Sequence, residues 1–124
     1  MRLSSHAADA MLDGLAARMK GASLRFYDQT PPGTASAELS GEQLLATLEF
    51  VSIELDAGQV RATCNEGLAK RSGRAAWAQC VDRDGKVLFD CVVGEKDSGA
   101  PVEMNTADFK KGGPVKLRSF AVGY

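Results

Sequence analysis

The fold of this chain is decided by residues 74–94, which read RAAWAQCVDRDGKVLFDCVVG. Two apolar runs flank the polar cluster Asp82-Arg83-Asp84-Gly85, and an Asp-Gly pair between such runs is typical of a β-hairpin. The chain's only tryptophan, Trp77, and two of its cysteines, Cys80 and Cys91, lie in this stretch. The sequence therefore predicts a central hairpin whose turn is formed by the polar cluster.

Two registers are open for this hairpin. In the first, a two-residue loop places Trp77, Gln79 and Val81 on one face with Leu88, Asp90 and Val92. In the second, a type I turn followed by a left-handed Gly85 places the same three residues with Val87, Phe89 and Cys91. We favour the second register, because it leaves Gln79 as the single polar residue of that face and a one-residue slip would reverse which face is buried. It predicts that Trp77, Phe89 and Cys91 belong to the structural core.

Length and composition indicate one ordinary globular unit. The chain has 124 residues, of which 44% are hydrophobic and 25% are charged, so it can bury one core. Its formal net charge of −1 gives no overall attraction to nucleic acid or anionic lipid. No apolar run approaches the roughly 20 residues of a membrane span. We therefore expect neither membrane nor nucleic acid among its partners.

The N-terminal region is predicted to be a helix from Ser5 to Lys20. Its apolar residues recur at helical spacing and form one stripe: Ala8, Met11, Leu12, Leu15 and Met19. Gly21 is the expected C-terminal capping residue. This predicts two units, an amphipathic helix or arm over residues 1–21 and a β domain over residues 22–124. The stripe packs either on the chain's own β domain or on a neighbouring subunit, and the sequence leaves both open.

The rest of the chain reads as short strands separated by turns. Strands are expected over Ser23–Asp28 and Leu44–Phe50, and a change of apolar phase after Phe50 indicates a bulge or corner near Val51. Further strands are expected from Val60, within Pro101–Met104 and over Val115–Val122. Closely spaced turn signals between such strands predict a mainly β protein. The expected architecture is an antiparallel β-sandwich, jelly-roll-like, with one N-terminal α-helix.

No residue pattern predicts a catalytic, metal or cofactor site. The single histidine, His6, lies at the start of the predicted helix, and three scattered cysteines do not give zinc-ligand spacing. Asp82-x-Asp84-Gly85 resembles the opening of a calcium loop but lacks the closing Glu, so a turn is favoured. Asp90 is expected to be a hydrogen-bonded structural carboxylate. We therefore expect a protein that is not an enzyme and holds no cofactor.

The three cysteines and the basic clusters are given structural interpretations. Because the N-terminus has no apolar signal region, Cys64, Cys80 and Cys91 are expected to be reduced thiols that pack as small hydrophobes. Two groups of cations are expected in solvated loops or subunit contacts: Lys70, Arg71 and Arg74, and then Lys110, Lys111, Lys116 and Arg118.

Several segments together resemble a family of known proteins. LRFYDQTPP at 24–32, LSG at 39–41 and LLATL at 44–48 follow the pattern L-R-I-Y-x-G-T-x-P … L-x-G-x-L-L-A-x-L. Further matches are Trp77 before VDRDG at 81–85, VVG at 92–94, NT at 105–106, GGPV at 112–115 and SF at 119–120. This resembles small virion structural proteins encoded in the assembly gene clusters of tailed bacteriophages. Gln29 departs from the pattern's Gly, and the stretch from Asp56 to Lys70 is shorter and more charged than expected.

The resemblance implies a structural component of a phage particle, assembled in the bacterial host cytoplasm and located in the virion. The leading hypothesis is a capsid decoration, or cement, protein that binds the major capsid protein or other virion proteins, with self-association expected. A head–tail connector or tail component is the alternative, and a small carbohydrate-binding β-sandwich module is a third. Apolar and aromatic anchors are the expected interface residues: Met11, Leu15, Met19, Phe26, Tyr27, Pro31, Pro32, Phe120 and Tyr124.

Overall fold

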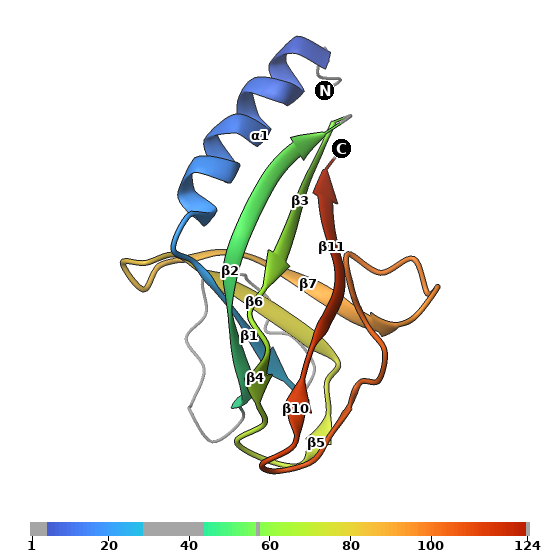
Figure 1. The fold of residues 1–124 in the computed structure, drawn as a ribbon. Helices are drawn as coiled ribbons and strands as arrows, with labels where there is room; N and C mark the ends of the chain where they lie inside the picture. The colour runs from blue at the N-terminus through green and yellow to red at the C-terminus, as the bar shows by residue number, and fades with distance from the viewer. Residues whose placement is uncertain (1–4, 29–43, 57, 124) are drawn as a thin grey trace.

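The computed structural model describes residues 5–28, 44–56 and 58–123. Within these ranges the chain forms one helix and a series of strands (Figure 1). Their bounds are α1 Ser5–Met19, β1 Ser23–Tyr27, β2 Leu44–Asp56, β3 Gln59–Cys64, β4 Gly67–Leu68, β5 Gly73–Arg74, β6 Trp77–Val81, β7 Val87–Glu95, β8 Val102–Met104, β9 Asp108–Phe109, β10 Pro114–Val115 and β11 Leu117–Gly123. The predicted helix and the mainly β class are both confirmed.

The strands close into a barrel and do not form the predicted sandwich. Seven of them follow the order β1-β2-β3-β11-β8-β7-β6. The barrel closes because β1 pairs with β2 along one edge and with β6 along the other. All of these pairings are antiparallel except that of β7 with β8. A sandwich and a barrel require the same alternation of apolar and polar residues, so the strand pattern alone could not distinguish them.

The central hairpin has the predicted turn and a register that differs from the prediction. Gly85 has φ of 83° and donates its N–H to the Asp82 carbonyl, as a type I turn with a left-handed glycine requires. Val81 then pairs with Val87, in the expected register. A second bulge at Leu88 shifts the pairing by one residue, so that Cys80 lies opposite Phe89. Trp77 consequently faces away from Phe89 and Cys91, which share a face with Ala78 and Cys80.

The turn is held by the side chain of Asp82, which is only 7% exposed. Its Oδ1 accepts hydrogen bonds from the backbone N–H groups of Asp84 and Lys86, each at 2.9 Å. We predict that Asp82→Ala lowers the free energy of unfolding by about 1–3 kcal/mol, because both donors lose their partner. Urea unfolding measures this, with Asp84→Ala as the control in the same turn. Equal losses in the two variants would contradict the role given to Asp82.

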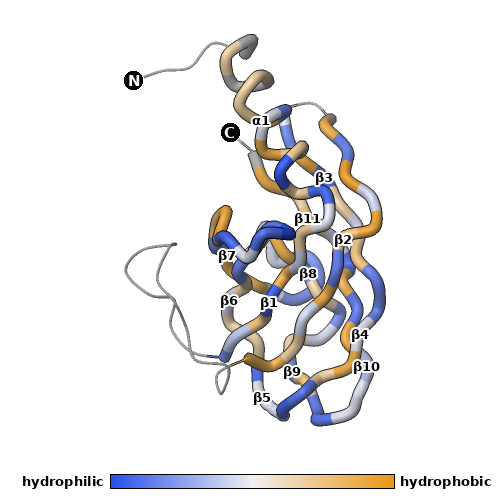
Figure 2. The backbone as a smooth tube through the Cα atoms, turned by 90° about the vertical axis from the view of Figure 1, so that its left-hand side faces the viewer, coloured by the Kyte–Doolittle hydropathy of each residue, from blue (hydrophilic) through white to orange (hydrophobic). Residues whose placement is uncertain are grey.

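The alternation along β2 changes phase at the predicted place. Phe50 pairs with Cys64 and Ser52 with Thr63, so Val51 is an extra residue in β2. Leu48 and Phe50 are buried before this bulge, whereas Val51 and Leu55 are exposed by 57% and 37%. Figure 2 shows hydrophobic and hydrophilic residues alternating along β2 and β3. The bulge near Val51 is therefore confirmed.

Aromatic rings fill the interior of the barrel. Phe120 lies at the centre of one cluster, with its ring 5.2 Å from Phe50 in an edge-to-face arrangement and 6.0 Å from Phe89. Phe26 and Phe109 form a second edge-to-face pair at 5.7 Å. Such pairs contribute about 0.5–1.5 kcal/mol beyond the area that they bury.

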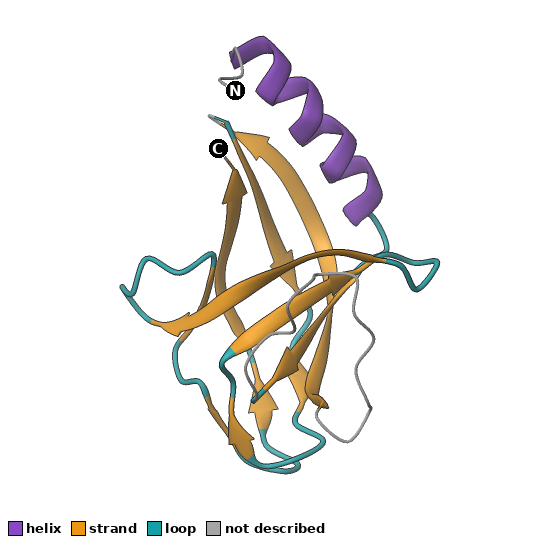
Figure 3. Ribbon diagram, turned by 180° about the vertical axis from the view of Figure 1, so that it is seen from behind, coloured by secondary structure: helices purple, strands orange, loops and turns teal. Residues whose placement is uncertain are grey.

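Helix α1 packs on its own barrel, beside β2 and β3 (Figures 1 and 3). Leu12 and Met19 of the predicted stripe are 3% and 0% exposed, whereas Met11 is 52% exposed. The helix ends at Met19, one residue before the predicted Lys20. Gly21 adopts φ of 77°, as predicted for the capping residue, and Ala22 donates its N–H to the Met19 carbonyl at 3.0 Å. Of the two packing alternatives, the structure shows the one within the chain.

Candidate functional site

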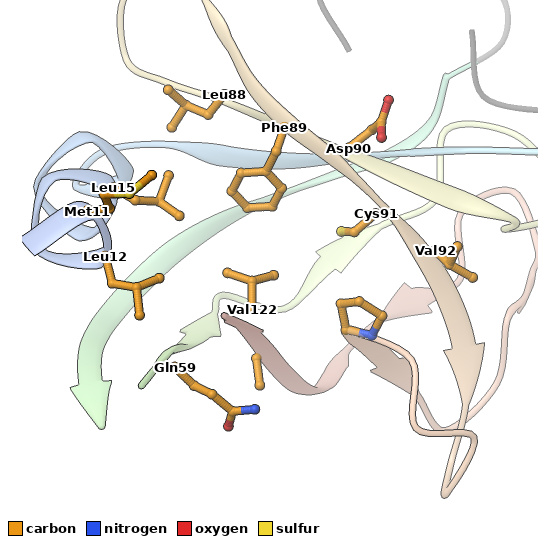
Figure 4. A pocket seen from close by; sticks show the side chains of 12 residues that line it. Met11, Leu12, Leu15, Gln59, Leu88, Phe89, Asp90, Cys91, Val92 and Val122 are labelled. Atoms are coloured by element: carbon orange, nitrogen blue, oxygen red, sulfur yellow. The ribbon is translucent and has the colours of Figure 1, made fainter. Parts of the chain in front are cut away.

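An apolar groove lies between α1, β7 and the end of β11 (Figure 4). Its volume is about 780 Å³. The residues that line it come from the helix, from β7, and from the strands and loop around the ends of β3 and β11: Met11, Leu12, Leu15, Gln59, Leu88, Phe89, Asp90, Cys91, Val92, Pro101, Ala121 and Val122. We call this feature the α1–β7 groove.

Alternation along β7 decides which side chains form the floor of the α1–β7 groove. Phe89 projects from β7 toward Val122, and Leu15 approaches from the helix (Figure 4). Phe89 also packs on the buried Phe120, so the floor is continuous with the core of the barrel. Asp90 points away from this floor (Figure 4). The groove therefore offers an apolar surface backed by rigid packing.

Two large apolar side chains at the groove are mostly exposed. Met11 of α1 is 52% exposed and Val92 of β7 is 61% exposed. Exposed apolar side chains gathered around a recess are typical of protein-binding surfaces, and a methionine adapts readily to a partner of irregular shape. The arrangement can bind an apolar segment of another protein.

The structure separates the predicted interface residues into three groups. Met11 and Leu15 lie in the α1–β7 groove. Pro31, Pro32 and Tyr124 lie outside the described residues. The remaining four are buried within the chain and cannot contact a partner: Met19, Phe26, Tyr27 and Phe120, at 0%, 0%, 4% and 2% exposed. The prediction chose them as bulky apolar residues, but the same property places them in the core.

Sequence reasoning missed Val92 and Val122 as groove residues. In the hairpin, Val92 shares a face with Trp77 only in the register that we do not favour, and Val122 is predicted only as the end of the strand Val115–Val122. The signal that could have identified Val92 is its place in Val92-Val93, where one of two adjacent strand valines must face away from the core. Nothing in the sequence indicates how far β7 and β11 separate.

All three predicted thiols are free, with Cys80 buried and Cys64 and Cys91 half-buried. Burial raises the pKa of each thiol from an ordinary 9.0 to about 12, and the Asp90 carboxylate adds to this effect at Cys91. The reacting species is the thiolate. The high pKa values therefore predict inert cysteines, although Cys91 lines the groove.

We predict that a thiol reagent modifies the folded chain roughly a thousandfold more slowly at pH 8 than the unfolded chain, because a pKa three units higher lowers the thiolate fraction by that factor. Absorbance of the released chromophore from a disulfide reagent, with and without denaturing urea, measures both rates. Fast modification of Cys91 in the folded chain would show that its thiol is not held neutral in the groove.

Several members of the basic clusters are paired with acidic groups. Arg74 contacts Asp108 at 2.9 Å and Glu95 at 3.2 Å, and Lys116 lies 3.7 Å from Glu66. The pKa of Glu95 is lowered, first by the hydrogen bond from the Ala107 N–H and then by Arg74. The interactions of the Glu95 carboxylate therefore stabilise the folded chain above the ordinary carboxyl pKa. This stabilisation is lost as the pH falls through the lowered pKa of Glu95. Arg74 lies on β5 and its partners on β9 and at the end of β7, whereas Lys116 and Glu66 lie in loops, so these pairs join segments of this chain.

The remaining candidate sites of the sequence are the Asp82 turn, a metal site, His6 and a membrane span. Asp82 caps the hairpin turn, as the turn interpretation expects. In the described ranges, no group of three His, Cys, Asp or Glu residues is placed to hold a metal ion. The side chain of His6 lies outside the described residues. Among the helices described, none is both long and apolar enough to span a bilayer.

Comparison of the chain with models of known protein families, with curated proteins and with solved structures finds no match. Support for a function of the α1–β7 groove therefore comes from its own geometry and from the sequence resemblance described above.

Proposed function

We propose that this chain is a bacteriophage virion structural protein, a capsid decoration protein that binds the major capsid shell. The observation that carries the proposal is the α1–β7 groove, an apolar recess with Met11 and Val92 exposed beside it. A protein that binds a shell needs a rigid body and an apolar contact surface. The closed barrel supplies the first and the groove supplies the second, and the virion role itself is taken from the sequence resemblance.

The carbohydrate-binding alternative is disfavoured by where the aromatic rings lie. Sugar-binding modules present exposed rings on which a saccharide stacks. Here Trp77 and Tyr27 are 1% and 4% exposed, and every other aromatic ring of the described chain is buried or half-buried. A glycan-binding screen with clear saccharide affinity would reverse this conclusion.

The test of the proposal is the position of the chain in purified phage particles. Mass spectrometry and a reconstructed particle should show the chain in many copies over the capsid surface. A few copies in one ring at the neck or tail would instead establish the connector or tail alternative. Particles that lack the chain would refute a virion role. Gene order offers a cheaper check, since adjacency to a major capsid gene favours decoration.

We predict that Met11→Lys, on the helix side of the groove, weakens binding of the chain to particles by about tenfold or more, because a charge at an apolar contact costs on the order of 1–2 kcal/mol. Co-sedimentation with particles that lack the chain measures this affinity. Leu68→Lys is the matched control, since Leu68 is 66% exposed and lies on β4, outside the groove. If both variants bind equally well, the groove is not the contact surface.

A further inference from the structure

The barrel wall is divided beside the α1–β7 groove. Strand β8 begins at Val102, which pairs with Val93 of β7, and the earlier residues of β7 pair with β6 alone. On the other side of the gap, β11 pairs with β8 only up to Phe120, and Ala121 then donates its N–H to the Pro101 carbonyl. Above this point β7 and β11 diverge (Figure 3). The groove is therefore a gap between two strands of one sheet.

Among the residues that the structure describes, no strand pairs with the β7 side of this gap before Val93. Val93 donates its N–H to the Ala76 carbonyl, on the β6 side. Because backbone groups of successive residues point to opposite edges of a strand, the N–H groups of Asp90 and Val92 point toward the gap. β8 begins only after Pro101, whose carbonyl accepts from Ala121 of β11 but which has no N–H with which to extend the ladder to β11. An unpaired edge of this kind is a template for an added strand.

The floor of the gap accommodates side chains at every second position of such a strand. Phe89 and Cys91 of β7 and Val122 of β11 line it, and Leu15 of the helix closes one side. At about 3.3 Å per residue, the six residues Val87–Val92 correspond to an edge of roughly 20 Å. An extended segment of about that length would place its apolar side chains on the floor and its polar side chains in solvent.

We propose that the α1–β7 groove binds an extended segment of a partner protein, which adds to the edge of β7 as a further strand of the barrel. The segment has apolar residues at alternate positions and occupies the place that β8 would fill if it continued beyond Pro101. The inference rests on the proposed function in so far as the partner is a virion protein. The mode of binding depends only on the two strand edges and the apolar floor.

A docked helix would satisfy this site less well. A helix pairs its own backbone groups internally, so it would cover the apolar floor and leave the N–H groups of Asp90 and Val92 unpaired. A strand satisfies these donors and covers the floor at once. A second copy of the chain, paired edge to edge through β7, is the other possible occupant and is examined in the same experiment.

The probe is the synthetic peptide Lys-Thr-Val-Thr-Val-Thr-Lys, capped at both ends and titrated into the isotopically labelled full chain. At saturation, hydrogen exchange measured by NMR should be at least tenfold slower at the Asp90 and Val92 amides. The same peptide with its alternate nitrogens methylated should give no such protection. Absence of protection by the unmodified peptide, protection by a Leu/Ala helical peptide instead, or edge-paired dimers of the free chain would each overturn the proposal.

Proline substitution tests the direction of the backbone groups. Asp90→Pro should fold, because the N–H that it removes points into the gap, and the probe should no longer protect the Val92 amide. Cys91→Pro is the matched control and should unfold the chain, because its N–H points to β6. If Asp90→Pro unfolds and Cys91→Pro does not, the edge assignment is wrong. The methylated peptide tests the proposal independently of either variant.

The two proposals can fail separately. If the chain occurs on the capsid but the Asp90 and Val92 amides of the bound chain exchange as fast as those of the free chain, strand addition is refuted and the virion role stands. If the peptide protects both amides but particles lack the chain, the virion role is refuted and strand addition stands.

Discussion

Replacing Phe120 with alanine is expected to lower the free energy of unfolding by about 3–5 kcal/mol. Phe120 is 2% exposed and contacts the rings of both Phe50 and Phe89. It lies on β11, in the last residue pair that this strand forms with β8, so its ring fills the core between the two aromatic neighbours. Domains of this size are stable by about 5–15 kcal/mol, and the variant should therefore unfold at a much lower urea concentration than the native chain.

Urea unfolding followed by the fluorescence of Trp77 measures this loss. Leu68→Ala is the control, because Leu68 is 66% exposed and exposed substitutions change stability by about 0.5 kcal/mol or less. A Phe50→Ala variant and the double variant then give the coupling between the two rings, which should lie near 0.5–1.5 kcal/mol. Additive losses would mean that the edge-to-face pair contributes nothing beyond the area it buries.

The local elements of this fold could be predicted because short-range chemistry determines them. Gly21 and Gly85 adopt positive φ at the helix end and at the hairpin turn, where the sequence places them for that reason. The bulge at Val51 was visible as a change of apolar phase. Each of these features depends on neighbours along the chain, so one sequence is sufficient to find it.

The global features depend on contacts that a pattern does not contain. Closure of the barrel requires β1 to pair with β6, about fifty residues further along the chain. The bulge at Leu88 reverses the faces of β7, and no glycine or proline marks it. The same limit applies to the groove. Met11 and Leu15 were predicted from the helical stripe, but the separation of β7 from β11 depends on where β8 begins.

Replacing Trp77 with alanine is the second substitution with a large expected effect. Trp77 is 1% exposed and lies opposite Tyr27 in the pairing of β1 with β6, with the two rings stacked at 4.8 Å and 22°. It is absent from the cluster inside the barrel that contains Ala78 and Cys80. The ring therefore anchors the opposite face of β6. The expected loss on Trp77→Ala is about 3 kcal/mol, measured by urea unfolding with circular dichroism.

The loss expected for Trp77→Ala lies at the lower end of the range for such substitutions, because the indole N–H of Trp77 lacks a hydrogen bond within the described chain. Its Nε1 is buried and has no hydrogen-bond partner among the described residues, and a buried donor without a partner costs about 1–3 kcal/mol. Trp77→Phe removes this donor and keeps a ring against Tyr27, so its stability should stay within about 1 kcal/mol of the native chain. If Trp77→Phe is as damaging as Trp77→Ala, the indole N–H has a partner and stabilises the chain through it.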